Sequence, residues 1–194
     1  MSLLAQLKEK RHSLKSIQTT IVYPDGRCYI ECRSSALPVE TINRPYGYVV
    51  DNKPDDKPAK ILNHLYLGSQ DCCKKEILEE HHITNVLSVG IQAPCVYDGI
   101  TYHFLNCLDL PETNIWEIIK NSVSVIRNSV MKCENILVHC NAGVSRSASI
   151  VIGYLILEQK FDYVDAFDYV HSIRPCIKPN EGFLKQLRNT IFIF

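Results

Sequence analysis

The residues best suited to chemistry stand together between residues 139 and 147, in the stretch His-Cys-Asn-Ala-Gly-Val-Ser-Arg-Ser. Cys140 offers a thiol, and Arg146, six residues later, offers a planar guanidinium whose parallel N–H groups suit the oxygens of a phosphoryl group. The mostly small residues between them allow backbone N–H groups to turn inward around an anion, and the following helix adds its dipole. These loop residues are Asn141, Ala142, Gly143, Val144 and Ser145. The combination predicts a nucleophilic thiol beside an anion-binding loop.

The residues that flank the spacing from Cys140 to Arg146 make this motif specific. Nine cysteines in 194 residues leave the spacing alone uninformative. His139 directly before the cysteine, Gly143 three residues after it and Ser147 seven after it make a chance occurrence negligible, and a merely structural cysteine at a strand end would not require them. Amide donors and a guanidinium lower a cysteine pKa from about 8.5 toward roughly 3.5 to 7.5. We therefore expect Cys140 to be a thiolate at neutral pH.

The elements that must hold this loop follow an alternating pattern. Short apolar runs typical of strands cover residues 61–67, 83–89, 100–107 and 136–139, and helical patterns cover 70–80, 113–131, 145–159, 163–173 and 182–193. Such alternation predicts an α/β domain with a central, mostly parallel sheet flanked by helices. Ligand sites in these sheets lie beyond the carboxyl ends of the strands, which is where Cys140 follows its apolar run.

The first 58 residues differ in character from the rest. Residues 2–17 place leucines at loosely helical spacing, and two β-rich runs at 19–23 and 27–31 flank a Pro-Asp-Gly turn, which predicts a short helix followed by a β-hairpin. Residues 34–60 contain four prolines and a charged cluster, as linkers do. We place the boundary near Pro58, with residues 1–58 as an N-terminal appendage and residues 59–194 as the main domain.

Composition limits the classes of partner. With 21 basic and 21 acidic residues the chain has no net charge, so no whole-molecule field attracts nucleic acid, and we expect no nucleic-acid partner. No apolar run approaches the roughly 18 residues needed to span a bilayer, so we expect no transmembrane segment. An odd number of cysteines and the lack of an apolar signal sequence indicate a reducing compartment, the cytoplasm first and the nucleus as an alternative.

The stretch from residue 139 to 147 resembles the signature loop of cysteine-dependent protein phosphatases, specifically the atypical dual-specificity branch. The resemblance extends to Leu-Tyr-Leu-Gly-Ser at 65–69, Ile-Thr-Asn-Val-Leu at 83–87, Leu-Asp-Leu-Pro-Glu-Thr-Asn at 108–114 and Pro-Asn-Glu-Gly-Phe at 179–183, all in family order. It implies that residues 59–194 form a dual-specificity phosphatase catalytic domain that needs neither metal nor cofactor.

The resemblance also implies a role for each residue of the loop. The thiolate of Cys140 attacks phosphorus in line, and water then hydrolyses the cysteinyl phosphate. Arg146 and the amides of residues 141–146 stabilise charge on the equatorial oxygens. Ser147 matches the family hydroxyl that hydrogen-bonds the sulfur and helps it leave. His139 is expected to orient the loop rather than act as a base, because the nucleophile is already ionised.

The leaving oxygen needs a proton, which in this family comes from an aspartate on a mobile loop. Asp109 matches that aspartate in order and context, 31 residues before Cys140. A Cys-Leu pair precedes it where the tyrosine-specific branch has Trp-Pro, so its mobility need not be the same. Asp109 as a cap for the helix from residue 113 is the alternative, and Glu112 and Asp98 are weaker candidates for the acid.

Three further features leave narrower choices. Asn180 matches a family residue near the loop, but Asn before a helix is also an ordinary N-cap, and both readings stay open. The His-His pair at 81–82 and the Cys-Cys pair at 72–73 match no standard zinc spacing, so we expect no metal site. The eight cysteines other than Cys140 are expected to be packing residues.

The expected substrate is a phosphoprotein. The loop lacks the lysines that phosphoinositide phosphatases commonly carry there, and a short catalytic domain implies a shallow pocket open to phosphotyrosine and to phosphoserine and phosphothreonine. The resemblance suggests proteins of mitogen- and stress-activated kinase cascades. Two other readings stay open: a phosphoprotein-binding adaptor that uses the same loop with little turnover, and a sulfurtransferase that carries persulfide on Cys140.

Overall fold

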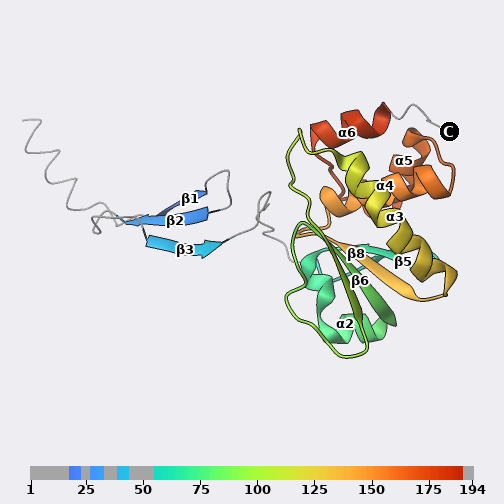
Figure 1. Ribbon diagram of the computed structural model, residues 1–194, viewed down its shortest axis with the longest axis horizontal. Helices are drawn as coiled ribbons and strands as arrows, with labels where there is room; N and C mark the ends of the chain where they lie inside the picture. The colour runs from blue at the N-terminus through green and yellow to red at the C-terminus, as the bar shows by residue number, and fades with distance from the viewer. Residues whose placement is uncertain (1–17, 23–26, 33–38, 44–54, 190–194) are drawn as a thin grey trace, which may run out of the picture. The chain divides into compact units, whose positions relative to one another are not determined.

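The structure is a computed structural model that describes residues 18–22, 27–32, 39–43 and 55–189. The chain divides into two compact units, Met1–Tyr46 and Gly47–Phe194 (Figure 1). The division falls inside the segment 34–60, whose prolines and charges predicted a linker. A domain boundary near Pro58 stays a prediction.

The first unit contains a small antiparallel sheet. Its strands β1 (Gln18–Val22), β2 (Arg27–Cys32) and β3 (Val39–Asn43) lie in the order β1-β2-β3. Gln18 pairs with Cys32 and Val22 with Cys28, so the predicted β-hairpin is confirmed. The third strand was not predicted, because it lies within the proline-containing segment. The helix predicted for residues 2–17 lies outside the described residues.

The second unit is built on a five-stranded sheet. Its strands are β4 (Ala59–Leu62), β5 (Leu65–Gly68), β6 (Ile83–Val89), β7 (Thr101–Leu105) and β8 (Asn135–His139), in the order β4-β5-β8-β6-β7. Only β4 and β5 pair antiparallel, and the other pairs are parallel. The mostly parallel α/β fold is therefore confirmed. The predicted single strand 61–67 is two strands, because the chain turns at Asn63 and His64, where φ of His64 is +67°.

Helices cover both faces of this sheet. A short 3-10 helix, η1 (Gln70–Cys73), and α2 (Lys75–Glu80) lie on one face, and α3 (Ile115–Met131), α4 (Arg146–Glu158), α5 (Tyr163–Ile173) and α6 (Glu181–Arg188) lie on the other (Figure 1). The helix predicted over 70–80 is interrupted at Lys74, whose ψ of 144° is extended. The helices therefore bury the central strands on both faces of the sheet.

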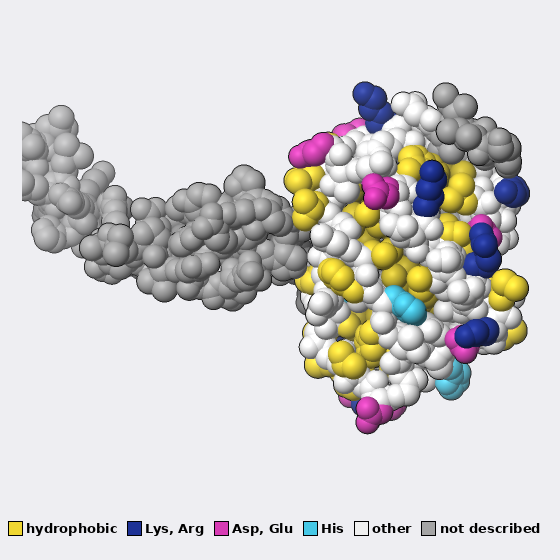
Figure 2. Space-filling model, viewed as in Figure 1, with side chains coloured by type: hydrophobic (Ala, Val, Ile, Leu, Met, Phe, Trp, Pro, Cys, Tyr) yellow, Lys and Arg dark blue, Asp and Glu magenta, His cyan; other side chains and the backbone are white. Residues whose placement is uncertain are grey.

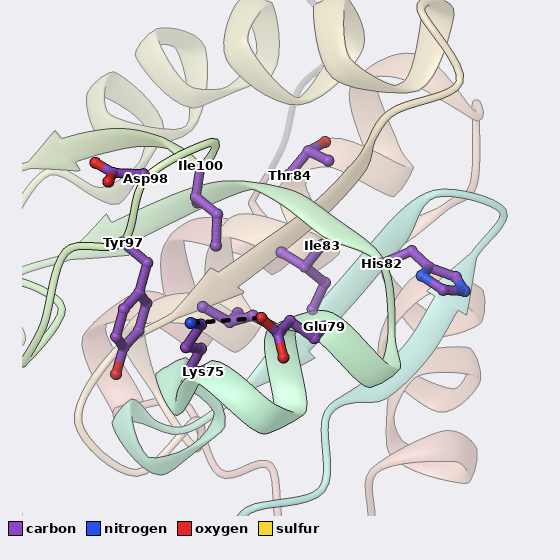
Figure 3. Close-up of a pocket in the computed structure, with 9 residues that line it drawn as sticks. Lys75, Glu79, His82, Ile83, Thr84, Tyr97, Asp98 and Ile100 are labelled. Atoms are coloured by element: carbon purple, nitrogen blue, oxygen red, sulfur yellow. Dashed lines mark ion pairs between the residues drawn. The ribbon is translucent and has the colours of Figure 1, made fainter.

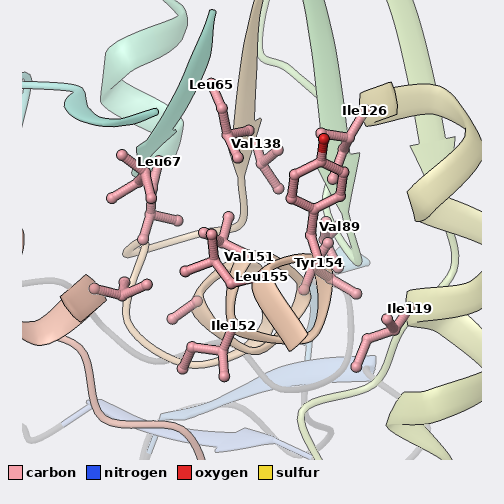
Figure 4. Close-up of a cluster of buried hydrophobic side chains, with 14 of the residues drawn as sticks. Leu65, Leu67, Val89, Ile119, Ile126, Val138, Val151, Ile152, Tyr154 and Leu155 are labelled. Atoms are coloured by element: carbon pink, nitrogen blue, oxygen red, sulfur yellow. The ribbon is translucent and has the colours of Figure 1, made fainter. Parts of the chain in front are cut away.

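The core explains why the loop after β8 is held firmly. Leu65 and Leu67 of β5 pack with the four-helix side, while Tyr66 between them packs with η1 and α2. The helix α4 is buried along its whole first eleven residues, as expected for a helix that is apolar on nearly every side (Figure 4). A Cβ on Gly153 would lie 2.5 Å from Cδ1 of Ile119, so glycine allows α3 and α4 to approach closely. The helix that receives the loop is thus fixed in the core.

Charges of both signs are interspersed on the face shown in Figure 2, with hydrophobic side chains between them. The described helices include none that is both long and apolar enough to cross a membrane.

Candidate active site

The thiol, the guanidinium and the hydroxyl singled out from the sequence come together where β8 ends and α4 begins. Cys140 directly follows β8, whose last four residues are buried, and Arg146 is the first residue of α4. Cys140 and Arg146 are each 2% exposed. The hydroxyl of Ser147 donates a hydrogen bond to Sγ of Cys140 at 3.2 Å.

Six consecutive carbonyl oxygens of the loop, from Cys140 to Ser145, accept hydrogen bonds from donors around it. The pairs are Cys140 O with His139 Nδ1 (3.1 Å), Asn141 O with Gln70 N (2.9 Å), Ala142 O with Arg174 Nη2 (3.2 Å), Gly143 O with Arg174 Nε (3.0 Å), Val144 O with Lys178 N (2.8 Å) and Ser145 O with Ser149 N (2.9 Å). In a trans peptide the N–H points away from the carbonyl of the same unit. The N–H groups of residues 141–146 therefore face the other side of the loop, as an anion site requires.

Two glycines give the loop and the guanidinium the room they need. Gly143 has φ +68°, and a Cβ there would lie 2.5 Å from the carbonyl oxygen of Gly68. Gly90 has φ +72°, and a Cβ there would lie 2.5 Å from Nη1 of Arg146. Larger residues at either position would therefore displace the backbone of the loop or the guanidinium.

Asp109 lies beside the loop and is held by two other elements. Its Oδ1 accepts hydrogen bonds from Oγ of Ser145 and from Nδ2 of Asn180, both at 2.7 Å. Its Oδ2 lies 3.6 Å from Nε of Arg146, and its side chain is 8% exposed. The structure thus brings the predicted acid next to the predicted nucleophilic loop. Asp109 does not cap α3, because Asn114 does so.

Asn180 fulfils both of the readings left open from the sequence. Its Oδ1 accepts a hydrogen bond from the backbone N–H of Phe183 at 2.9 Å and so caps α6. Its Nδ2 donates to Asp109, and its backbone N–H donates to Oγ of Ser145 at 3.1 Å. One residue therefore links the start of α6 to the aspartate and to the loop.

His139 is buried beneath the loop and is neutral. Burial lowers its pKa to about 4. Its Nδ1 lies 3.1 Å from the carbonyl of Cys140, which can only accept, so Nδ1 carries the proton. Its Nε2, 2.7 Å from Oγ of Ser88, then accepts a hydrogen bond from that hydroxyl. Nδ1 thus holds the carbonyl of Cys140 and Nε2 ties the ring to β6, while an orienting role for His139 stays a prediction.

Three residues of this arrangement were not anticipated from the sequence. Arg174 holds two loop carbonyls, Ser88 fixes the ring of His139, and Gln186 of α6 accepts a hydrogen bond from the backbone N–H of Ile115 at 3.0 Å. They lie between 31 and 71 residues from the groups they contact. An arginine directly before Pro175 at a helix end was the only local signal, and it does not indicate a contact with the loop.

The weaker acid candidates have different surroundings from Asp109. Glu112 is exposed. Asp98 lines a separate pocket of about 390 Å³ between α2, the start of β6 and the chain before β7, where Lys75 and Glu79 form an exposed ion pair at 3.8 Å (Figure 3). This pocket lies at the amino end of β6, whereas Cys140 lies at the carboxyl ends of the strands. Asp109 is therefore the carboxylate that the fold places beside the loop.

The other cysteines whose side chains the structure describes fall into two groups. Cys72, Cys73 and Cys107 are buried, and burial raises the pKa of these thiols to about 11, about 12 and about 12 respectively, so they stay protonated. Cys95, Cys133 and Cys176 are exposed, so the expectation that all cysteines other than Cys140 are packing residues is wrong for these three. Loop and turn positions, rather than strands or helices, place them at the surface.

Comparison with known proteins agrees with this geometry. Residues 65–190 match the family model of the dual specificity phosphatase catalytic domain. Mouse dual specificity protein phosphatase 19 is 40% identical over 144 residues, which is 73% of this chain and 66% of the mouse protein. A probable dual specificity protein phosphatase of Dictyostelium discoideum is 35% identical over 219 residues, 95% of both chains. The chain therefore spans just under two thirds of the mouse relative and nearly all of the other.

Solved structures and larger relatives give the same picture. The human tyrosine phosphatase-like serine/threonine/tyrosine-interacting protein superposes with a TM-score of 0.63 and 34% identity over 68% of this chain and 93% of that one. A Dictyostelium discoideum protein named MAP kinase phosphatase with leucine-rich repeats protein 1 is 36% identical over 68% of this chain, which spans 16% of it. Residues 65–190 form a dual specificity phosphatase catalytic domain, and the chain belongs to the dual specificity phosphatase family.

Proposed function

We propose that this chain is a protein phosphatase that hydrolyses phosphotyrosine and phosphoserine or phosphothreonine through a cysteinyl-phosphate intermediate. The observation that carries this proposal is the orientation of the loop. Six carbonyls are bound from outside, so that the N–H groups of residues 141–146 point away from those donors, in the loop that begins at Cys140. Such an array is complementary to the charge that develops on a phosphoryl group in the transition state.

In the first step the thiolate of Cys140 forms a bond to phosphorus while the bond to the leaving oxygen breaks. Arg146 and the loop amides stabilise the equatorial oxygens. The leaving oxygen takes a proton from Asp109. Oδ1 of Asp109 accepts two hydrogen bonds, and Oδ2 is the oxygen on the side of Arg146, 3.6 Å from its Nε. The carboxyl group therefore lies on the side of the group that Arg146 binds, where it can deliver a proton to the leaving oxygen.

In the second step water attacks phosphorus and the bond to sulfur breaks. Asp109, now ionised, accepts the proton of the water. The hydroxyl of Ser147, 3.2 Å from Sγ of Cys140, donates a hydrogen bond to the departing thiolate. Inorganic phosphate leaves and Asp109 is again protonated, so the cycle closes with no metal ion or cofactor.

We extend the proposal to the substrates. The loop has no lysine to hold an additional phosphate, which favours a phosphoprotein over a phosphoinositide. A relative named as a MAP kinase phosphatase supports substrates in mitogen- and stress-activated kinase cascades, either the kinases or their activators. Phosphopeptides that differ only in phosphotyrosine or phosphothreonine would measure the preference directly.

Hydrolysis of a small aryl phosphate tests the proposal. The full chain should release the aryl alcohol, and Cys140→Ser should lower kcat by at least about 10⁴-fold, because an unactivated hydroxyl replaces the nucleophile. Cys176→Ser makes the same chemical change at an exposed site and should keep the wild-type rate. Equal rates for the wild type and Cys140→Ser, or no turnover by either, would contradict the proposal that the chain is a phosphatase acting through Cys140.

A phosphoprotein-binding adaptor is the second candidate. The observation in its favour is the 34% identity to a solved protein named as phosphatase-like and as an interacting protein. If the chain is an adaptor, the wild type will bind a phosphopeptide and release no phosphate from it. A sulfurtransferase would instead take sulfur from thiosulfate and would not depend on Asp109. Measuring phosphate release, peptide binding and thiosulfate consumption on one preparation separates the three.

A further inference from the structure

Arg174 holds the phosphate-binding loop from behind. It follows the last residue of α5 and is 4% exposed. Its Nε donates to the carbonyl of Gly143 and its Nη2 to the carbonyl of Ala142, at 3.0 and 3.2 Å. These two carbonyls lie in the middle of the loop, so the orientation of the guanidinium determines which way the central amides point.

The guanidinium is itself held by the chain that precedes β4. Oδ2 of Asp55 lies 2.5 Å from Nη2 of Arg174, and Nη1 donates to the carbonyl of Lys57 at 3.4 Å. The backbone of Asp55 is anchored separately, because its carbonyl accepts hydrogen bonds from Oγ of Ser69 at 2.5 Å and Sγ of Cys72 at 3.4 Å. Removing the carboxylate therefore need not release the segment.

The charge of Asp55 matters because a buried cation needs a counter-ion. The side chain of Arg174 is 5% exposed and that of Asp55 is 32% exposed, so the carboxylate lies between the guanidinium and solvent. Neutral carbonyls hydrogen-bond a guanidinium but do not neutralise it. Without the carboxylate, the guanidinium gains by rotating toward water, and this rotation would weaken its bonds to the two loop carbonyls.

We infer that Asp55 is a positioning residue for the active site: its carboxylate fixes Arg174, and Arg174 fixes the amides that bind the phosphoryl oxygens. This inference rests on the proposed function for its catalytic consequence, but its effect on oxyanion binding does not require turnover. It also means that the segment before the first strand of the main domain, which sequence patterns class as linker, belongs to the support of the loop.

The direct test is tungstate binding to the full chain that carries Cys140→Ser, which lacks the nucleophilic thiol. Calorimetry should show Asp55→Asn weakening tungstate affinity by about three- to thirtyfold, the range typical of residues that act through another group. Asp55→Glu keeps the charge and should recover part of the loss. Asp56→Asn removes a neighbouring exposed carboxylate and should keep the parent affinity. Melting temperatures of all variants are measured alongside.

A cycle with Arg174→Gln distinguishes positioning from a general loss of structure. If Asp55 acts through Arg174, the double variant binds tungstate no more weakly than Arg174→Gln alone. Additive losses, or an affinity of Asp55→Asn equal to that of Asp56→Asn, overturn the inference. If Asp55→Asn is unfolded at the assay temperature, Asp55→Glu replaces it in the cycle. Additive losses of tungstate affinity for a folded Asp55→Glu and for Arg174→Gln, measured in their double variant, would also overturn the inference.

The outcome is independent of the phosphatase proposal. Restoring Cys140 and measuring aryl phosphate hydrolysis tests the enzyme, and kcat/KM of Asp55→Asn should fall by the same factor as tungstate affinity. Absence of turnover in the wild type with the expected tungstate series would contradict the phosphatase and leave the positioning role supported. Turnover by the wild type together with the same tungstate affinity in all Asp55 variants would support the phosphatase and contradict the positioning role.

Discussion

The side chain of Asp109 is held by more contacts than an aspartate on a freely mobile loop would make. Ser145 at the start of α4 and Asn180 at the start of α6 both donate to its Oδ1, and Arg146 lies near its Oδ2. Side chains of the fold itself therefore hold the aspartate beside the loop, which reduces the entropy lost in reaching the transition state.

Replacing Asp109 with Asn should lower kcat on an alkyl or other poor leaving group by roughly 10²- to 10⁴-fold, because the leaving oxygen no longer receives a proton. The loss should shrink as the leaving group becomes more acidic, and a series of aryl phosphates measures this slope. Glu112→Gln, an exposed carboxylate on the same loop, is the matched control and should retain wild-type slopes. A slope that Asp109→Asn does not change would assign the acid to another group.

Ser147 should act on the second step more than on the first. Ser147→Ala leaves Sγ of Cys140 without its 3.2 Å donor, so the thiolate leaves phosphorus less readily. We expect kcat to fall by about 10- to 100-fold, the value of a hydrogen bond to a charged group, with KM falling as well. Rapid-mixing measurements should show a burst of aryl alcohol that the wild type lacks.

A buried serine on another helix provides the control for this substitution. Ser129→Ala on α3 removes a hydroxyl that bonds only within its helix, to the carbonyl of Val125. It should produce no burst. A Ser147→Ala variant that loses rate with no burst and an unchanged KM would place its effect on the first step instead.

The packing of α6 against the loop that carries Asp109 depends on one glycine. A Cβ on Gly182 would lie 2.0 Å from the carbonyl oxygen of Pro111 and 2.3 Å from its Cα. Both contacts are with backbone, which cannot rotate away. The clash outweighs the gain of about 1 kcal/mol in helix propensity that alanine brings.

Gly182→Ala should therefore push the loop that carries Asp109 away from α6. We expect kcat on poor leaving groups to fall by about tenfold or more, since small displacements of a catalytic group are costly. Glu181→Ala in the same helical turn is exposed and should have no such effect. Equal kinetics for the two variants would mean that the acid loop does not depend on α6.

The burial of His139, the last residue of β8, should make stability depend on pH, because burial lowers the pKa of its imidazole. The pKa of His139 is about 4 in the folded chain and near 6.5 when unfolded, so the unfolded state binds a proton first as the pH falls. By linkage, the free energy of unfolding should drop by about 2 kcal/mol between pH 7 and pH 5 on account of this residue.

Urea unfolding at the two pH values checks this expectation. His139→Gln removes the titrating ring, so its stability should fall less between pH 7 and pH 5 than that of the wild type. Ser88→Ala lowers stability at both pH values but keeps a buried imidazole, and it should retain the wild-type difference. A His139→Gln variant with the full pH dependence would locate the titration in other groups.

The sequence allowed prediction of those parts of the site that are local in the chain. Cys140, the loop and the start of α4 are adjacent residues, and Asp109 and Asn180 each stand at the end of an identifiable element. Arg174 and Asp55 could not be inferred, because the contacts of Arg174 with Asp55 and Lys57 join residues 117 or more positions apart, and an arginine or aspartate has no local preference that reveals such a partner. The turn that splits β4 from β5 was missed because apolar residues flank it closely.

At the scale of the whole molecule, the charge-neutral composition leaves recognition to a local site. The anion-binding groups are a short row of amides, one arginine and a helix terminus at the carboxyl ends of the parallel strands. Affinity for a phosphoprotein therefore comes from the phosphate and its immediate surroundings rather than from a field around the chain. Association should depend weakly on ionic strength.

That expectation can be measured with the full-length Cys140→Ser chain and a fluorescent phosphopeptide of zero net charge outside the phosphate. The association rate constant should change by less than about threefold between 0.05 and 0.5 M salt, because steering by net charge is absent. A peptide with four added lysines is the comparison. A tenfold slower association for the neutral peptide at high salt would reveal a charged surface outside the loop.

The donors that bind the six loop carbonyls come from five separate parts of the domain: β8, η1, the end of α5, the chain before α6, and α4. The loop is consequently a junction at which five separate parts of the domain meet. Partial opening of any one part disturbs it, so the catalytic loop has no stability of its own apart from the fold. In a urea titration, loss of activity and loss of helical signal should therefore follow a single cooperative transition.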